Sequence, residues 1–396
     1  MKNISNFSIV LIGFSYTFLI INKIAFGITI GLSVLILLNK YKSIIVKELK
    51  VIIIKDMNKL NFSLVSLFLL SFFFSTLKSI EIYRSLLVFL YLILFIIFSL
   101  LIYFIFHKKK YELELLLKSL SLSILFNSVL IFIYNITNYN SGELVMFKGY
   151  MNILSLITIL NLYLLRSRLN FISTILLIPN IFMTGSAASI LGILFGTIFC
   201  VIYLLFKKYI NSLFFKNFLI LFSFLILIIS SSIFLKNLPS KFDIDSMTSF
   251  EYKIPINLLD VHRQIIWGFT FNKFKDKPLF GYGPDSSNFI EGSQKDIGIQ
   301  MTGDMNFIPS HPHNFFFELL LETGLVGTML FILFLVYVNF KVSRINDSVR
   351  FNIFLIFLNA YFWGSSLVNF SFWLGWWQGS YYLLLSILAS RGFQEK

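Results

Sequence analysis

Long apolar runs recur along this chain, and they constrain the fold more than any other feature. A helix needs about 20 consecutive, mainly apolar residues to cross the hydrocarbon core of a bilayer. The chain is 57% hydrophobic and 13% charged, whereas soluble domains have roughly 25% charged residues. We therefore predict an all-α polytopic membrane protein with about twelve transmembrane helices, near residues 5–22, 24–39, 61–77, 84–106, 116–136, 151–165, 171–184, 187–206, 217–235, 314–340, 351–368 and 373–390.

Basic residues lie mostly between these runs and account for the net charge of +14. In a soluble protein this charge would suggest nucleic-acid binding. Here it follows the positive-inside rule, which places Lys and Arg in cytoplasmic loops. Alternating the runs from a cytoplasmic N-terminus puts most lysines and arginines inside, so both termini are predicted to be cytoplasmic. We expect membrane lipids and no nucleic acid as partners, and Cys200, the single cysteine, allows no intramolecular disulfide.

One segment departs from this pattern. Residues 236–313 form a long loop with mixed charge and most of the prolines, and residues 258–274 within it have a helical pattern. Loops of this length are uncommon and are often functional. We predict three parts: nine N-terminal helices over residues 1–235, a periplasmic loop with short helices over 236–313, and three C-terminal helices over 314–396.

Three of the four histidines, His262, His311 and His313, lie in this loop. The fourth, His107, precedes three lysines and is interpreted as a solvated cytoplasmic residue. A histidine at the mouth of a membrane helix can accept a proton near neutral pH. The alternative is that it hydrogen-bonds to an interfacial backbone group. For His311 and His313, which flank Pro312 just before the tenth run, we favour the proton-accepting role.

Two carboxylates follow the histidines in the tenth run. Asn314, Glu318 and Glu322 are spaced by four residues and share one helix face. An ionisable side chain that faces lipid costs about 2.5–3.5 kcal/mol at mid-span. Both glutamates are therefore expected to face the bundle interior, water or a basic partner. Gly324 and Gly327 predict a close approach of helices.

A second group lies in the middle of the long loop. Arg263 and Trp267 are one helical turn apart, and the Pro278, Gly281 and Gly283 turn follows them. An arginine beside an aromatic ring suits a phosphate or pyrophosphate with an attached sugar. The alternative is a surface helix that lies on the membrane.

Arg84, at the outer end of the fourth run, either adds positive charge to the same mouth or anchors the interface. The small residues of Thr184, Gly185 and Ser186 predict a turn between the seventh and eighth runs. Asp243 and Asp245 form a spaced acidic pair, which is weak evidence for a site. We find no metal-binding signature, and we expect neither a metal nor a cofactor.

Together these motifs resemble the O-antigen ligase and O-antigen polymerase superfamily. The resemblance rests on Arg263 with Trp267, the Pro278 to Gly283 turn, His313 with Asn314, and Glu322 with Gly324 and Gly327. It implies a metal-independent, inverting glycan transferase of the bacterial inner membrane that acts on the periplasmic side. The implied donor is an undecaprenyl-pyrophosphate-linked glycan, and the acceptor is lipid A core or a growing glycan.

By position, the resemblance makes His313 the catalytic base and Arg263 the residue that stabilises the leaving pyrophosphate. Arg84, Trp267, His311, Asn314, Glu318 and Glu322 are the predicted substrate-binding residues. Many relatives carry an arginine after the serine of the 184–186 turn, where this chain has Ala187. That charge is either missing or supplied by Arg84 or a lysine.

The leading hypothesis is therefore a glycan-transferring enzyme of the ligase type, with a polymerase as the alternative within the superfamily. The alternative from another class is a flippase for lipid-linked oligosaccharides. Such a transporter is expected to carry its charges along a central cavity and to have short loops, so the long loop with His and Arg argues against it.

Overall fold

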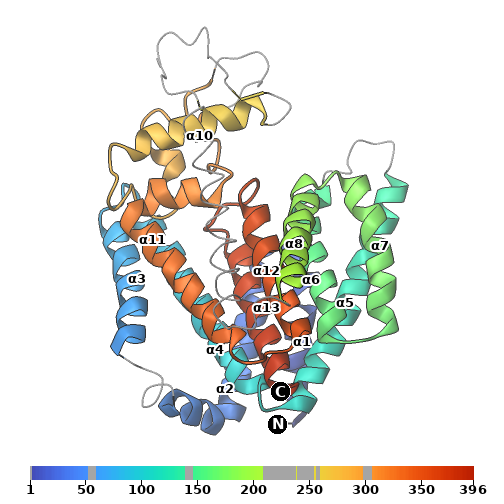
Figure 1. The fold of residues 1–396 in the computed structure, drawn as a ribbon. Helices are drawn as coiled ribbons and strands as arrows, with labels where there is room; N and C mark the ends of the chain where they lie inside the picture. Colours follow the sequence, from blue (N-terminus) through green and yellow to red (C-terminus); the bar gives the residue numbers. More distant parts are fainter. Residues whose placement is uncertain are drawn as a thin grey trace.

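The computed structural model describes residues 2–51, 59–138, 146–207, 238, 254–255, 259–297 and 306–396. In these residues the protein is all-α apart from short irregular segments and an isolated β-bridge (Figure 1). The helices are α1 (Lys2–Ile21), α2 (Lys23–Val51), α3 (Lys59–Leu77), α4 (Ile82–Phe106), α5 (Lys110–Thr137), α6 (Lys148–Leu164), α7 (Arg168–Thr184), α8 (Ala187–Phe206), α10 (Val261–Phe274), the 3-10 helix η3 (Ser287–Phe289), α11 (Phe315–Ser343), α12 (Val349–Ser366) and α13 (Gly375–Gln394).

The helices follow the apolar runs, because in lipid a helix satisfies its backbone hydrogen bonds within itself. The predicted run at 217–235 lies outside the described residues, and each of the others coincides with α1 to α8 or α11 to α13. Six of these helices are long and apolar enough to cross a membrane: α1, α2, α4, α5, α8 and α11. The prediction of a polytopic membrane protein is thus confirmed.

The predicted turn between the seventh and eighth runs is also confirmed. Gly185 ends α7 in the left-handed conformation, with φ of 59°, which glycine adopts without steric cost. Its amide donates to the carbonyl oxygens of the preceding helical turn. The chain then reverses into α8, and the Ser186 and Ser189 hydroxyl groups lie 2.6 Å apart.

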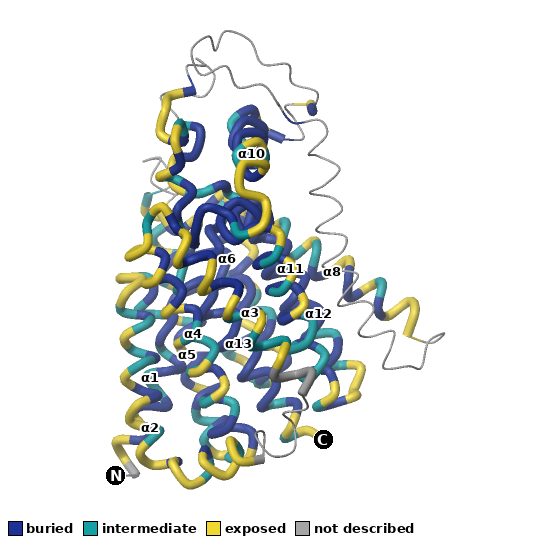
Figure 2. Tube along the Cα trace, turned by 90° about the vertical axis from the view of Figure 1, so that its left-hand side faces the viewer, coloured by how far each residue is buried: buried dark blue, intermediate teal, exposed yellow. Residues whose placement is uncertain are grey.

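The helices pack as a bundle, with both chain termini at the end opposite to α10 (Figure 1). Neighbouring pairs are α1 with α2 and α5, α5 with α7, α4 with α13, α8 with α12, α3 with α11, and α10 with α11. Aromatic rings fill the centre, where Phe362 stacks on Trp377 at 4.4 Å between ring centroids. Large apolar residues of α1, α2 and α4 are exposed, and Figure 2 shows exposed positions in yellow along the outside of the bundle. Such faces suit contact with lipid.

His107 corrects one expectation. It is buried rather than solvated, with 3% of its surface exposed. Its ring stacks on Tyr103 and meets the edge of Phe393. The buried environment at the end of α4 therefore includes His107, although three lysines follow it directly.

The predicted helix in the long loop is present as α10, at the end of the bundle remote from the termini (Figure 1). Asp260 caps its first turn by accepting from the Arg263 amide at 2.8 Å. The face of α10 that includes Ile265, Ile266 and Phe269 is buried. This burial fixes α10 against the start of α11 and so positions the residues described next.

Candidate active site

The connection between α12 and α13, residues 367–374, collects contacts from most of the predicted site residues. We call this segment the site loop. Arg263, His311 and His313 reach its backbone from the long loop, and Glu318 and Glu322 reach it from α11. The structure thus brings together residues that are separated by up to about 110 positions in the chain.

His311 and His313 share one acceptor. The Nε2 atom of His311 and the Nδ1 atom of His313 each lie 2.9 Å from the carbonyl oxygen of Asn369. A carbonyl oxygen only accepts, so both of these ring nitrogens must carry protons. In the neutral ring, Nε2 of His313 is then the unprotonated nitrogen, as a general base requires.

The two imidazoles are half-buried, with ring centroids 4.1 Å apart. Burial lowers the pKa of His313 from 6.5 to about 4, and the neighbouring His311 is the second cause. Burial also lowers the pKa of His311. Both rings are therefore neutral at pH 7.

The backbone around His313 is held from two sides. His313 has a φ of 54°, which is uncommon for a residue other than glycine. On one side, the indole Nε1 of Trp267 donates to the carbonyl oxygen of Pro312 at 2.9 Å. On the other, the side chain of Asn314 caps α11 by accepting from the amides of Phe316 and Phe317.

Trp267 and Asn314 were predicted to bind substrate, and these contacts indicate that they instead position His313. Trp267 is 5% exposed and packs edge-on against Phe317, and Asn314 is also buried. Neither side chain offers a free surface to a substrate. Their geometry instead suits orienting His313, as residues behind a catalytic group commonly do.

Arg263 stands nearer to solvent than Trp267, with 39% of its side chain exposed. Its Nη1 atom donates to Asp260 at 2.6 Å, and its Nη2 atom donates to the carbonyl oxygen of Val368 at 3.2 Å. Val368 precedes Asn369, so the guanidinium lies beside the carbonyl that orients the histidines. The two catalytic candidates, Arg263 and His313, therefore flank the same loop.

Glu318 and Glu322 are fully buried and face the bundle interior, as predicted. Glu318 accepts from the Ser371 hydroxyl and from the Phe372 amide, each at 2.6 Å. Glu322 accepts from the amides of Asp285 and Ser287 and from the indole of Trp373. The carboxylate oxygens of both glutamates are hydrogen-bonded to the protein. The two side chains therefore position the site loop and do not bind a substrate.

Helix α11 is interrupted at Gly324, which has φ of 67° and ψ of −174°. Residues 278–283 lie along the break and pair with its free backbone groups. The amides of Tyr282 and Gly283 donate to the carbonyls of Leu321 and Glu322. In the other direction, the amides of residues 325 and 326 donate to the carbonyls of residues 278 and 279.

Glycine is required where these two backbones meet. A Cβ on Gly324 would lie 2.2 Å from the carbonyl oxygen of Leu279, and one on Gly281 would lie 2.4 Å from Glu322. The close approach predicted for Gly324 is therefore made by an extended loop rather than by a second helix. At Gly327, a Cβ would lie 3.7 Å from the Phe72 ring of α3.

Arg84 pairs with Asp285 at 2.7 Å between Nε and Oδ2, and it lies over the ring of Phe289. Asp285 has a φ of 54°, and burial raises the pKa of its carboxyl, with Arg84 acting in the opposite direction. The Asp285 amide also contacts Glu322. Arg84 is thus linked to the site through Asp285, and within the described residues it contacts Asp285 and Phe289 rather than the histidines.

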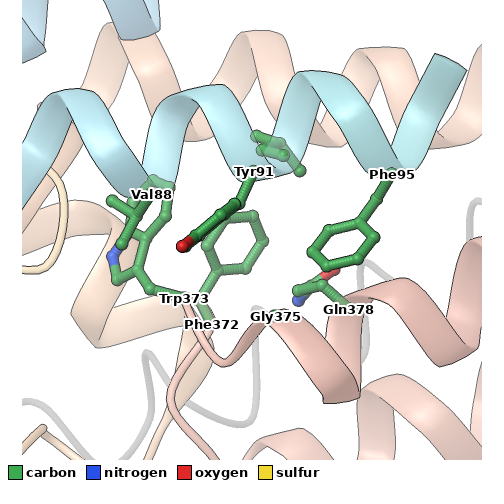
Figure 3. A pocket seen from close by; sticks show the side chains of 8 residues that line it. Val88, Tyr91, Phe95, Phe372, Trp373, Gly375 and Gln378 are labelled. Atoms are coloured by element: carbon green, nitrogen blue, oxygen red, sulfur yellow. The ribbon is translucent and has the colours of Figure 1, made fainter. Parts of the chain in front are cut away.

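A small recess lies between α4 and the start of α13 (Figure 3), and its volume of about 10 Å³ leaves room for roughly one water molecule. Its wall is mainly apolar and includes Phe372 and Trp373 of the site loop. The other lining residues are Val88, Tyr91, Leu92, Phe95, Gly375 and Gln378. Gln378 is 3% exposed, and its amide atoms have no hydrogen-bond partner within the described residues. The recess therefore lies on the α4 side of the loop that the histidines contact.

Sequence reasoning missed the site loop itself. Asn369 and Ser371 lie between two apolar runs, Trp373 is the first residue of the second run, and none of the three belongs to a motif. The one available signal was the polar pair Asn369 and Ser371 within an aromatic stretch. The described residues contain no group of three or more potential metal-ligating side chains. Asp243 and Asp245 lie outside the described residues.

Comparison with known proteins matches the O-antigen ligase family over residues 172–332. A protein named "Putative polysaccharide ligase" from Rickettsia conorii is 35% identical over 122 residues, which cover 30% of this chain and 29% of that protein. A relative with the same description from Rickettsia typhi is 32% identical over 216 residues, covering 52% of this chain and 48% of the relative. The chain thus matches about half or less of the length of these relatives. These matches confirm the resemblance to the O-antigen ligase family that the motifs predicted.

Proposed function

We propose that this protein is an inverting glycan transferase of the O-antigen ligase type. In this proposal it moves a glycan from an undecaprenyl-pyrophosphate carrier onto a hydroxyl group of lipid A core at the periplasmic face. The observation that carries the proposal is the fixed tautomer of His313. Its Nδ1 proton is committed to Asn369, so Nε2 is free to accept a proton.

The proposed step forms one bond and breaks one. The acceptor oxygen attacks the anomeric carbon of the donor sugar, and its proton passes to Nε2 of His313. The bond between that carbon and the pyrophosphate oxygen breaks, and the pyrophosphate leaves with the electron pair. Arg263 faces the same loop and would stabilise the developing charge, as positioned cations do in such transfers. His313 later returns the proton to solvent.

The outer face of α4 suits the isoprenoid tail of the carrier. Large apolar side chains of this helix are exposed, and the apolar residues Phe372 and Trp373 of the site loop lie beside it. A carrier bound there would place its head group near the site loop while its tail stays in lipid. This arrangement keeps the polar reaction outside the hydrocarbon.

Complementation of a deletion strain with designed variants tests the proposal. His313→Asn is the informative variant, because the Asn amide can occupy the position of Nδ1 and donate to Asn369. Asparagine also tolerates positive φ. This variant therefore keeps the fold and removes only the base, whereas His313→Ala also loses the hydrogen bond.

We expect His313→Asn to insert normally and to abolish glycan transfer, with long lipid-linked chains accumulating. Core sugars that carry a single repeat unit in the deletion strain would indicate the polymerase instead. Unchanged lipopolysaccharide in the deletion strain, or full activity of His313→Asn, would overturn the proposal. A flippase would show a third pattern, with undecorated core and lipid-linked glycan retained on the cytoplasmic side.

A further inference from the structure

Lys148 stands where three elements meet at the end of the bundle that carries the site loop. It begins α6 and is exposed. The hydroxyl of Ser186, which precedes α8, donates to the carbonyl oxygen of Lys148 at 3.1 Å. The next residue, Gly149, faces the site loop: a Cβ there would lie 3.7 Å from the ring of Phe370. Phe370 directly follows Asn369, the acceptor of both histidines.

The two arginines near the site already have counter-ions. Arg263 pairs with Asp260 at 2.6 Å, and Arg84 pairs with Asp285 at 2.7 Å. Each pair is close to neutral as a unit. A pyrophosphate carries more than one negative charge, so these pairs alone leave part of that charge uncompensated.

Lys148 makes no ion pair within the described ranges, so its charge is not compensated there. Two lysines near the end of α10, Lys273 and Lys277, lie over aromatic rings instead. Lys273 is ten residues beyond Arg263, or about 15 Å along the helix axis, and it lies over the ring of Phe269. Lys277 lies over the ring of Tyr282. Ala187, the exposed first residue of α8, brings no charge of its own.

We propose that Lys148 binds the diphosphate of the lipid-linked donor. This inference rests on the proposed function and adds a residue to it. An ammonium group is a compact charge with three donors on a flexible stem, so it can follow the diphosphate from binding to departure. In this arrangement both Arg263 and Lys148 contact the diphosphate beside the site loop, and α6 supplies a charge that Ala187 does not bring.

Binding measurements on the purified full-length protein in detergent test this assignment. The probes are inorganic pyrophosphate and farnesyl diphosphate, a short isoprenoid diphosphate. The variants are Lys148→Gln, which removes the charge, and Lys148→Arg, which retains it. Lys23→Gln is the matched control, because Lys23 is an exposed lysine that begins α2 at the same end of the bundle.

We expect Lys148→Gln to weaken binding of both probes roughly tenfold to a hundredfold, as loss of a hydrogen bond between charged groups implies. Lys148→Arg should restore most of the affinity, and Lys23→Gln should bind like the wild type. The thermal midpoint of Lys148→Gln should not change, since its side chain is exposed. In transfer assays, KM for the donor should rise while KM for the acceptor stays constant.

Two results would overturn the assignment: unchanged affinity in Lys148→Gln, or a wild type that binds neither probe. The outcome is separable from that of the proposed function. If transfer depends on His313 but binding is independent of Lys148, the enzyme stands and the lysine assignment falls. If binding depends on Lys148 but no glycan is transferred, the diphosphate site stands and the transferase proposal falls.

Discussion

The Nδ1 atom of His313 lies 2.9 Å from the carbonyl oxygen of Asn369. The same oxygen accepts from His311. A backbone carbonyl in the connection between α12 and α13 thus sets the tautomer of the candidate base. This hydrogen bond also orients the base, because Nε2 of His313 lies on the side of the ring away from the Asn369 carbonyl.

The first prediction concerns the acid side of the pH profile. Since burial lowers the pKa of His313 from 6.5 to about 4, the base stays unprotonated well below its ordinary range. We expect kcat/KM to be flat between about pH 5.5 and 7 and to fall only in more acidic buffer. Assays of glycan transfer to an acceptor analogue across this pH range measure the dependence of kcat/KM on pH. An acid limb centred near pH 6.5 would contradict the geometry.

The same shift predicts a stability change. The unfolded chain takes up a proton on His313 near pH 6.5, whereas the folded protein does so only near pH 4. The unfolded state therefore binds more protons between these values, and the stability of the wild type should decrease as pH falls from 6.5 towards 4. Thermal unfolding in detergent should show a smaller decrease for His313→Asn, which cannot take up this proton.

A third prediction separates the two buried glutamates. Each carboxylate oxygen of Glu322 accepts from at least one N–H group, so an amide there would set two donors against each other. Glu318 faces one N–H and the Ser371 hydroxyl, which can also accept. We expect Glu322→Gln to lower the free energy of unfolding by about 1–3 kcal/mol and Glu318→Gln to cost less. Denaturant unfolding of both variants, with the exposed variant Glu291→Gln as the control, measures these free energies. Equal losses of unfolding free energy in Glu322→Gln and Glu318→Gln would refute the prediction.

A fourth prediction tests the break in α11. Alanine at position 324 would meet the Leu279 carbonyl and would also adopt a left-handed φ. We expect Gly324→Ala to reduce the yield of folded protein severely, whereas Gly27→Ala in α2, where a Cβ meets nothing within 4 Å, should be tolerated. Size-exclusion profiles of detergent extracts measure both. A monodisperse Gly324→Ala with wild-type activity would show that the break is not needed.

A fifth prediction uses the ion pair of Arg263. Asparagine at position 260 can still cap α10, but it removes the charge that neutralises the arginine. We expect Asp260→Asn to tighten binding of inorganic pyrophosphate by up to about fivefold, the range expected for an exposed pair. Calorimetric titration with pyrophosphate measures this affinity. Asp260→Ala distinguishes the loss of the counter-ion from the loss of the helix cap, because it removes both. Weaker binding by Asp260→Asn would contradict the proposed role of Arg263.

Much of the site could be predicted from local pattern. The four-residue spacing of Glu318 and Glu322 placed them on a buried face, and the cluster of His311 and His313 was correctly identified as the start of a helix. What pattern could not supply was the partner of each residue. The Ser371 hydroxyl is 53 positions from Glu318, and no local period connects them.

The same distinction explains Trp267. Its spacing from Arg263 suggested a shared surface, but adjacent turns of a short helix need not face the same environment. Arg263 turns towards solvent and the site loop, while Trp267 inserts against Phe317 and Pro312. Packing of α10 on α11 decides between these faces, and a single helix pattern does not contain that information.

The sequence by itself determined that this chain forms apolar helices, because lipid leaves the backbone few alternatives to the helix. It also indicated a turn at Gly281 and a close approach of backbone at Gly324. Only the tertiary structure decided that those glycines let a loop repair a broken helix, and that the connection between α12 and α13 orients the histidines. The physical reason is that backbone carbonyls and amides carry these contacts, and their positions depend on how distant segments pack rather than on which side chains they bear.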